Sequence, residues 1–570
     1  MRYLKLAELY ESLDSTTKRL EKTEILSKFL ESVSEKDKDV LYLLLGDIYP
    51  EYDERRIGIS NQLAIQAISK STGTEKSKVI KEWKKIGDIG KVAKELTNKK
   101  TQSTLASHIL TTEKVIENFR KLPELQGSGT VGKKLSLITE LLTSASPIEA
   151  LYITRTLIGD LRIGVQESTI RESIAKAFFP EEESAAEKVQ RAIDKTNDIS
   201  AVFELAKKGK LSDLDKLNLE VGKPIKAMLA QKVLTIEDGF KALGTPCAIE
   251  YKYDGFRLLI HKNGNEVKLY TRSLENVTKQ FPEVKEYVLN YIKGETFIMD
   301  SEAVGFDSKT KEYLSFQNIS QRIRRKYAIE ELQKKLPVEI NIFDILFYNG
   351  KSLLNEPFKK RSELLRKIIT PKPYKLIPSK QLITEDTKKA KEFYKKALKD
   401  NQEGIMMKSL EAEYKPGRRV GHMLKIKPEE RDLDLVITGA EYGTGKRSGW
   451  LSSLILSCRE GNRFLEVGKM GTGIKEKSDE EEDTISFEEM TEKLKPLIIG
   501  EKGKTVKIKP KIILAVSYQE IQHSPNYNSG FALRFPRFTA LRTDKPLSEI
   551  ATLEEIKKDF ENQKRNWAYG

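Results

Sequence analysis

The chain has little cysteine and little histidine. Its two cysteines, Cys247 and Cys458, lie far apart and neither belongs to a CxxC pair. This excludes a disulfide framework and a four-cysteine zinc site. The four histidines are too scattered for a metal cluster. We therefore expect a protein of the reducing cytoplasm.

Long apolar runs are also missing. No 18 apolar residues follow one another, and the N-terminal residues bring in charge before a hydrophobic stretch can form. The sequence thus predicts neither a signal peptide nor a membrane span.

Charge and length are what the chain has in abundance. Its 570 residues are 38% hydrophobic and 32% charged, and at about 150 residues per domain they suggest three or four folded domains, of which we take three as the working number. Lysine and arginine outnumber aspartate and glutamate by 100 to 85, for a net charge of +15. This favours polyanionic partners, nucleic acid first among them. The alternative is a charge-rich surface that serves solubility or heat tolerance.

The hydrophobic pattern changes twice along the chain. Residues 1–215 carry apolar residues at helical spacing, such as Leu135, Ile138 and Leu142, and predict an all-helical domain. Residues 216–430 alternate β-branched and polar residues, interrupted by two expected helices at 315–336 and 359–369, and predict a mixed α/β domain. Residues 431–570 carry short strands and glycine turns, and predict a small β-barrel.

The mixed domain opens with a group of ionisable residues. In the run EYKYDGFR at 250–257, strand alternation would place Glu250, Lys252 and Asp254 on one face. A lone KxDG match is weak in a lysine-rich chain. It is followed in order, however, by TRS at 271–273, FIMDSE at 297–302, NIFD at 341–344, EGIMMK at 403–408 and HMLKIK at 422–427. In the last of these, alternation would align Lys425 with Lys427.

This ordered series resembles the motifs of the covalent nucleotidyltransferase superfamily, from residue 222 to the end of the chain. The resemblance becomes closer in the helical region, where TLIGDLRIGV at 156–165 is similar to a signature of archaeal and eukaryotic ATP-dependent DNA ligases. Near the end of the chain, ALRFPRF at 532–538 with RTDK at 542–545 is similar to the last motif of those ligases. The resemblance implies a helical DNA-binding domain, a mixed α/β nucleotidyltransferase (adenylation) domain and an OB-fold β-barrel domain. One departure is Met423, where many relatives carry Trp.

The resemblance also implies a reaction. Lys252 would attack the α-phosphate of ATP and keep AMP, pass it to a DNA 5′-phosphate, and the adjoining 3′-hydroxyl would then seal the nick. Such phosphoryl transfer depends on positioning and electrostatics, which suits a site made of Arg, Lys and Glu. The attacking amine must be neutral, whereas an unperturbed lysine has a pKa of about 10.4. Neighbouring Arg257, Lys425 and Lys427, a bound metal ion and partial burial are the open alternatives for removing its proton.

The remaining roles are likewise those that the resemblance implies. Glu250 would contact the adenine edge, Phe343 would stack on the purine, and Glu302 would bind the ribose. Mg²⁺ or Mn²⁺ would take a carboxylate, Glu403 or Glu302, because hard cations prefer oxygen ligands. The side chains expected at the nucleotide and its phosphates are Arg257, Arg272, Arg419, Lys425 and Lys427, joined from the last motif by Arg537, Asp544 and Lys545.

Expected partners follow from the same resemblance. They are nicked double-stranded DNA and, as a further candidate, a sliding clamp. The protein would be a monomer that acts on DNA of the nucleoid in replication, repair and recombination. Arg322, Arg324 and Arg325 are interpreted as a phosphate-contacting patch rather than a solvated helix face. The alternatives are an RNA ligase or capping-type enzyme, which needs no helical domain around duplex DNA, and a non-catalytic DNA-binding relative. An NAD-dependent ligase is disfavoured because its zinc-binding cysteines are missing.

Overall fold

The computed structural model describes residues 1–99, 109–127, 129–314, 316, 319, 322–323, 329–417, 421–428, 431–444, 447–476 and 485–569. By its internal contacts the chain divides into two compact units, Met1–Ile426 and Lys427–Gly570. Each is described by itself below.

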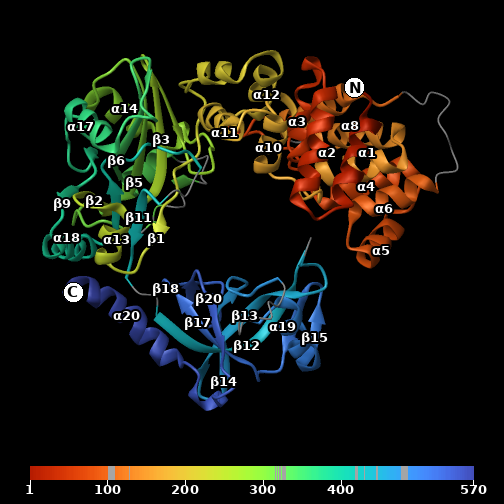
Figure 1. Cartoon of the computed structure of the whole chain (residues 1–570). Coiled ribbons are helices and arrows are strands. Elements are labelled where there is room, and N and C mark those ends of the chain that lie inside the picture. Colours follow the sequence, from red (N-terminus) through yellow and green to blue (C-terminus); the bar gives the residue numbers. More distant parts are fainter. Residues whose placement is uncertain are drawn as a thin grey trace. The chain divides into compact units, whose positions relative to one another are not determined.

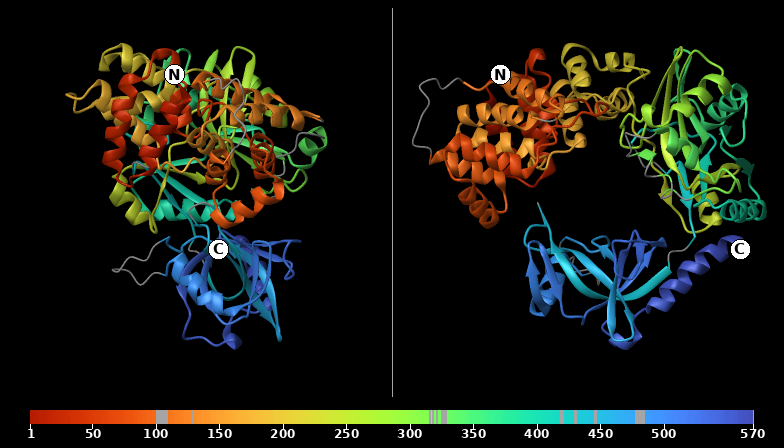
Figure 2. Two further views of the ribbon diagram at one scale, coloured as in Figure 1. Left: turned by 90° about the vertical axis from the view of Figure 1, so that its right-hand side faces the viewer. Right: turned by 180° about the vertical axis from the view of Figure 1, so that it is seen from behind.

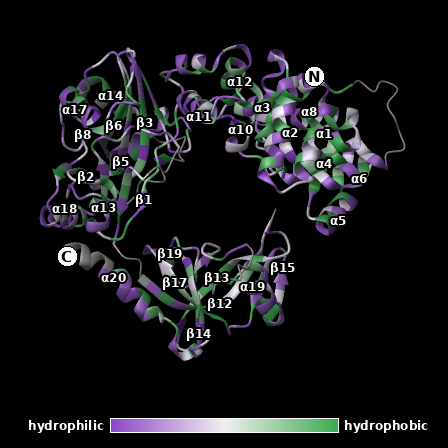
Figure 3. Ribbon diagram, in the orientation of Figure 1, coloured by the Kyte–Doolittle hydropathy of each residue, from purple (hydrophilic) through white to green (hydrophobic). Residues whose placement is uncertain are grey.

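The N-terminal half of the first unit is helical, as predicted (Figure 1). In Figure 3 hydrophobic and hydrophilic residues alternate along these helices, and their apolar sides form one core that includes Tyr3, Leu141 and Phe203. Helix α9 begins at Pro147, and the Glu149 carboxylate accepts the backbone N–H of Ser146 at 2.8 Å. The helices are α1 (Tyr3–Asp14), α2 (Arg19–Ser32), α3 (Val40–Leu44), α4 (Asn61–Thr72), α5 (Lys76–Ile86), α6 (Ile89–Asn98), α7 (Thr112–Glu124), α8 (Thr130–Ser144), α9 (Pro147–Leu157), α10 (Glu167–Phe178), α11 (Ala185–Thr196) and α12 (Ile199–Lys208).

The rest of this unit holds two sheets. The larger has the strand order β4-β3-β5-β6-β7, with β8 parallel to β6. One of its faces packs against helices α14 (Pro282–Tyr291) and α17 (Phe358–Ile368). The strands are β3 (Phe256–Asn263), β4 (Glu266–Tyr270), β5 (Thr296–Gly305), β6 (Val338–Tyr348), β7 (Lys351–Ser352) and β8 (Leu376–Pro378).

The second sheet has the order β1-β11-β10-β2-β9. Helices α13 (Ile236–Leu243) and α18 (Thr387–Lys399) cover one of its faces, through a core that includes Phe240, Ile249 and Ala397. The strands are β1 (Gln231–Lys232), β2 (Cys247–Lys252), β9 (Gln381–Thr384), β10 (Gly404–Ser409) and β11 (Met423–Ile426).

The helix predictions for this region were incomplete. The helix expected at 359–369 is confirmed as α17. Of the one expected at 315–336, α16 (Ile329–Lys335) is present, and part of the remainder lies outside the described residues. Helices α13, α14 and α18 were not predicted.

The second unit is built mainly of strands, as predicted. Its main sheet runs β14-β13-β12-β16-β15, with β17 pairing β12 and β20, and β18 pairs β19 separately. Figure 2 shows helix α20 (Leu553–Tyr569), in dark blue, lying beside these strands, and α19 (Phe487–Leu494) contributes Phe487 and Met490 to the core. The strands are β12 (Arg431–Tyr442), β13 (Leu451–Glu460), β14 (Arg463–Met470), β15 (Ile498–Lys502), β16 (Thr505–Ile508), β17 (Ile513–Tyr518), β18 (Glu520–His523), β19 (Phe531–Arg534) and β20 (Arg537–Leu541).

Across the described residues, no helix combines the length and the apolar character that crossing a membrane requires.

Candidate active site

The candidate nucleophile lies at the end of strand β2. Ile249 and Tyr251 point to the core under α13 and α18, so Glu250 and Lys252 face the other way. The expectation that Asp254 shares this strand face is wrong, because β2 ends at Lys252. Asp254 follows in the turn to β3, where its backbone N–H donates to the Gln402 side chain at 3.0 Å.

Lys252 is held by the residue that precedes strand β10. Its Nζ lies 2.7 Å from Oε2 of Glu403, and the Glu403 backbone N–H donates to the Lys252 carbonyl at 2.9 Å. The two side chains are 22% and 14% exposed. The amine is thus reachable from solvent while a carboxylate fixes its position.

The larger sheet supplies a buried arginine. Strand pairing sets Arg257 opposite Glu302 and Leu259 opposite Asp300, so Arg257, Glu302 and Asp300 share a sheet face. The Nε and Nη2 atoms of Arg257 donate to the Asp300 carboxylate at 2.6 and 3.0 Å, and the Tyr414 hydroxyl donates to Asp300 at 2.9 Å. Nη1 of Arg257 is buried and makes no hydrogen bond within the described residues. It is the guanidinium nitrogen that remains for a ligand.

Glu302 faces the same space as Lys252. Burial raises the pKa of Glu302 to about 8; Lys252 and Arg257 act against this, while the charges of Glu403 and Asp300 add to it. Because their charges act on one another, these four residues form one electrostatic cluster. The two sheets and the turn before β10 supply them: Lys252, Glu302, Glu403 and Arg257.

Glu250 is buried beside this cluster. Its Oε2 pairs with Nζ of Lys408 at 2.6 Å, and its Oε1 accepts from Nε2 of Gln381 at 2.9 Å. Lys408 also donates to the Phe343 carbonyl at 3.2 Å, and its Nζ lies 4.9 Å from the centre of the Phe343 ring. One lysine therefore holds both the expected adenine contact and the expected stacking residue.

Phe343 stands at an irregularity in strand β6. Asp344 pairs with Asp300 and Ile342 pairs with Ser301, so Phe343 is the extra residue of a β-bulge. Bulges redirect side chains at functional sites. The β-bulge thus sets the direction of the partly exposed Phe343 ring, which strand alternation alone does not predict.

The other predicted site residues are less closely connected to the cluster. Arg272 is exposed after β4, and Lys425 is half-buried on β11, opposite Met406 of β10. Arg419 lies outside the described residues. The predicted strand alignment of Lys425 with Lys427 is wrong, since β11 ends at Ile426.

The remaining phosphate contacts that were predicted belong to the second unit. These are Lys427, Arg537, Asp544 and Lys545. Arg537 is exposed at the start of β20, and Lys545 pairs with Asp434 at 2.5 Å.

The expected arginine patch is not confirmed. Arg322 is 2% exposed and pairs with Glu283 at 2.7 Å, so it supports the fold and does not contact phosphate. Arg324 and Arg325 lie outside the described residues.

Four residues of the site had been given no role from the sequence. Asp300 and Lys408 stood in quoted motifs, where strand alternation carried the signal. Gln381 and Tyr414 lie outside every motif, and only the fold brings them to the site.

Within the described residues, no three histidine, cysteine, aspartate or glutamate side chains form a group that could hold a metal. Glu302 and Glu403 supply two carboxylates. Mg²⁺ is commonly bound by one or two carboxylates together with substrate phosphates and water, so this pair fits such an ion.

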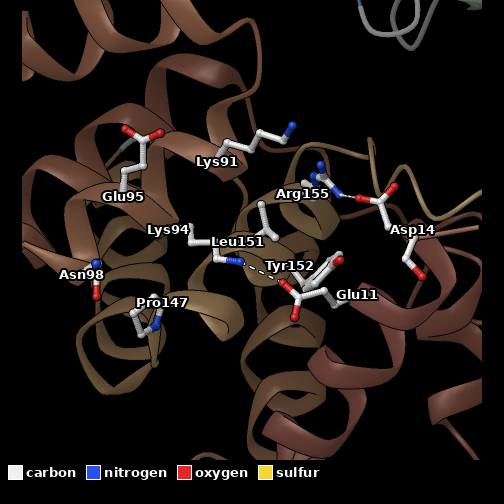
Figure 4. A pocket seen from close by; sticks show the side chains of 11 residues that line it. Glu11, Asp14, Lys91, Lys94, Glu95, Asn98, Pro147, Leu151, Tyr152 and Arg155 are labelled. Atoms are coloured by element: carbon white, nitrogen blue, oxygen red, sulfur yellow. Dashed lines mark hydrogen bonds and ion pairs between the residues drawn. The ribbon is translucent and has the colours of Figure 1, made fainter.

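A hollow of about 610 Å³ lies elsewhere, among helices α1, α6 and α9 (Figure 4). Ion pairs line it, including Lys94 with Glu11 at 2.9 Å and Arg155 with Asp14 at 3.2 Å. It lacks the arrangement of groups found around Lys252.

Known proteins resemble the chain over its whole length. Residues 2–175 match the family "DNA ligase N terminus", 227–427 the "ATP dependent DNA ligase domain", and 447–545 the "ATP dependent DNA ligase C terminal region". A DNA ligase of Nanoarchaeum equitans is 43% identical over 99% of both chains, and one of Thermococcus onnurineus is 40% identical over 99% of both. A solved structure named "Pmar-Lig_PreS3" shares the fold, with a TM-score of 0.57 at 19% identity, over 94% of this chain and 99% of its own.

Proposed function

Since this chain belongs to the ATP-dependent DNA ligase family, we propose that it seals nicks in duplex DNA and carries AMP on Lys252. The observation that supports this role best is the cluster at the end of β2. There a reachable amine lies 2.7 Å from a carboxylate, next to a buried arginine with one nitrogen left for a ligand.

The reaction proceeds in three transfers. Nζ of Lys252 loses a proton and attacks the α-phosphorus of ATP; an N–P bond forms, and pyrophosphate leaves with the electrons of the broken P–O bond. An oxygen of the DNA 5′-phosphate then attacks the same phosphorus and frees the lysine. Finally the 3′-hydroxyl attacks the 5′-phosphate, and AMP leaves. Before the first step, the Lys252 amine must leave its ion pair with Glu403 so that it can attack the phosphorus.

The surrounding residues position the nucleotide. Glu250 accepts a hydrogen bond from the amino group of adenine, because Lys408 and Gln381 fix its two oxygens. Phe343 stacks on the purine and Glu302 meets the ribose. Nη1 of Arg257 donates to the nucleotide, and Lys425, with Arg272 and Arg419, serves the phosphates.

We also propose a divalent ion, Mg²⁺ or Mn²⁺, at Glu403 and Glu302. A cation there offsets the repulsion between the two carboxylates that contributes to the raised pKa of Glu302. When bound, the ion would neutralise phosphate charge during the transfer. Glu403 then no longer needs Lys252 as its counter-charge.

Three domains serve this reaction in our proposal: a helical DNA-binding domain at 1–215, an adenylation domain at 216–430 and an OB-fold domain at 431–570. The three matched family segments, which fall within these ranges, support the division. Arg537, Asp544 and Lys545 would act on the leaving pyrophosphate, for which Lys545 exchanges its partner Asp434, and Lys427 would hold the triphosphate.

In the cell, we propose that a monomer acts on nicked DNA of the nucleoid during replication, repair and recombination, with a sliding clamp as a further partner. Sedimentation with and without a clamp protein tests the monomeric state and the clamp association. A stable dimer, or no clamp complex, contradicts the corresponding one.

Nucleotide and strand specificity test the function itself. The chain is incubated with labelled ATP or GTP, and then with nicked duplexes of DNA or RNA. Labelling by ATP and sealing of DNA are expected. Labelling by GTP alone would instead indicate a capping-type enzyme, and sealing of RNA alone an RNA ligase.

A further inference from the structure

Gln381 is a polar residue beside the site that no motif includes. It opens strand β9 and lies directly opposite Glu250 in the pairing of β9 with β2. Its Nε2 donates to Oε1 of Glu250 at 2.9 Å. Since a carboxylate only accepts hydrogen bonds, this contact sets the side-chain amide with its nitrogen towards Glu250.

The Gln381 side-chain amide also contacts helix α17, which packs on the larger sheet. Ser362 of helix α17 is buried, and its hydroxyl lies 3.1 Å from Nε2 and 3.3 Å from Oε1 of Gln381. Arg366 of the same helix reaches only 4.0 Å from Oε1 of Glu250. Gln381 is therefore the neutral donor that fixes this oxygen, whereas Lys408 fixes the other.

We propose that Gln381 is a positioning residue that sets selectivity for adenine through Glu250. The inference rests on the proposed function, in which Glu250 accepts from the 6-amino group of the purine. With one donor on each oxygen, the carboxylate cannot rotate, and its free lone pairs keep one direction. A purine with a 6-amino donor matches it, and guanine, with an acceptor at this position, is repelled.

A leucine at this position separates the proposed role from a general structural one. Gln381→Leu keeps the size of the side chain and removes the donor, so Glu250 is no longer fixed on one side. Formation of the covalent nucleotide–protein bond, seen as label kept in a denaturing gel, is measured at several concentrations of α-labelled ATP and of α-labelled purine riboside triphosphate, which lacks the 6-amino group.

With ATP, KM is expected to rise on the order of tenfold, the effect of one lost hydrogen bond to a charged group. With the analogue, which has no amino group to offer, the change should stay within about twofold. Gln381→Glu places a second carboxylate against Glu250 and is expected to raise the KM for ATP more strongly still. Labelling by GTP should gain relative to ATP in both variants.

Ile383→Ala is the matched control. Ile383 lies two residues further along β9, is exposed, and pairs with Ala248 instead of Glu250. Its KM values are expected to equal those of the natural chain, and thermal unfolding checks that every variant is folded.

The possible results separate the two claims. Equal losses with ATP and the analogue, or no loss in either Gln381 variant, would overturn the positioning role while leaving the proposed function intact. Absence of label on the natural chain with ATP would contradict the proposed function itself.

Discussion

At the scale of single residues, Tyr414 connects two segments through the site. Its hydroxyl donates to Asp300 at 2.9 Å and accepts the backbone N–H of Met228 at 3.1 Å, and Asp300 in turn holds Arg257. Removal of the hydroxyl leaves a buried N–H without a partner and weakens the hold on Arg257.

We therefore predict that Tyr414→Phe lowers the free energy of unfolding by about 1–2 kcal/mol and slows AMP transfer to the enzyme. Chemical denaturation and single-turnover labelling measure the two effects. Tyr394→Phe is the control, since the Tyr394 hydroxyl on α18 makes no hydrogen bond within the described residues. Equal behaviour of the two variants would contradict the role of the Tyr414 hydroxyl.

His261 makes stability depend on pH. Burial, with Arg257 and Lys268 nearby, lowers the pKa of His261 to about 3, while its Nδ1 accepts the Gly222 N–H at 2.9 Å. Below pH 6.5 the unfolded chain gains a proton here that the folded chain does not bind. Stability is therefore lost as the pH falls from about 6.5 towards 3, at up to roughly 1.4 kcal/mol per pH unit.

His261→Asn keeps an acceptor for Gly222 but does not titrate. We predict that its free energy of unfolding, measured by denaturation at several pH values, falls less steeply below pH 6.5 than that of the natural chain. Parallel curves for the two proteins would show that His261 contributes nothing to the acid sensitivity.

At the scale of elements, the turn between β2 and β3 must pass very close to β5. A Cβ atom on Gly255 would lie 2.3 Å from the carbonyl oxygen of Ala303, so the backbone has to shift to accept one. This turn connects Lys252 to Arg257, and Ala303 follows Glu302.

Gly255→Ala is thus expected to lower the rate of enzyme–AMP formation by at least about tenfold, because small displacements of reacting groups are costly. The control is Gly132→Ala in helix α8, where a Cβ meets nothing within 4 Å. It should keep the rate and gain up to about 1 kcal/mol in stability. An unchanged rate in Gly255→Ala would contradict the close approach.

The elements also show how much of the fold and the site can be predicted from the sequence. Alternation in β2 was enough to place Glu250 and Lys252 on one face, whereas Lys408 of the motif EGIMMK joins that face only through the pairing of β10 with β2. Helix α18 was missed although Ala390, Phe393 and Ala397 stand at helical spacing behind the N-cap Asp386. That signal was present, and so was Pro282 at the start of α14.

Other features leave no local signal. The bulge at Phe343 results from the register between β5 and β6, which sequence periodicity does not contain. Gln381 meets Glu250 across 131 residues of chain, and Tyr414 meets Asp300 across 114. Such contacts depend on strand order and need the fold.

For the whole molecule, the net charge of +15 predicts how DNA binding responds to salt. Lysine and arginine contacts to phosphates release counterions from DNA. If several such contacts form, affinity for a nicked duplex should fall on the order of a thousandfold between roughly 50 and 200 mM salt. Titration at several salt concentrations measures the slope. A flat dependence would contradict broad phosphate contact.

The central claim is that Lys252 carries AMP, and Lys252→Ala tests it most directly. The variant and the natural chain are incubated with α-labelled ATP and a divalent ion, and label that stays on the protein in a denaturing gel is measured, with thermal unfolding and DNA binding as checks. The account predicts that the label is abolished while folding and DNA binding are kept. Label retained on the folded variant would show that another residue is the nucleophile.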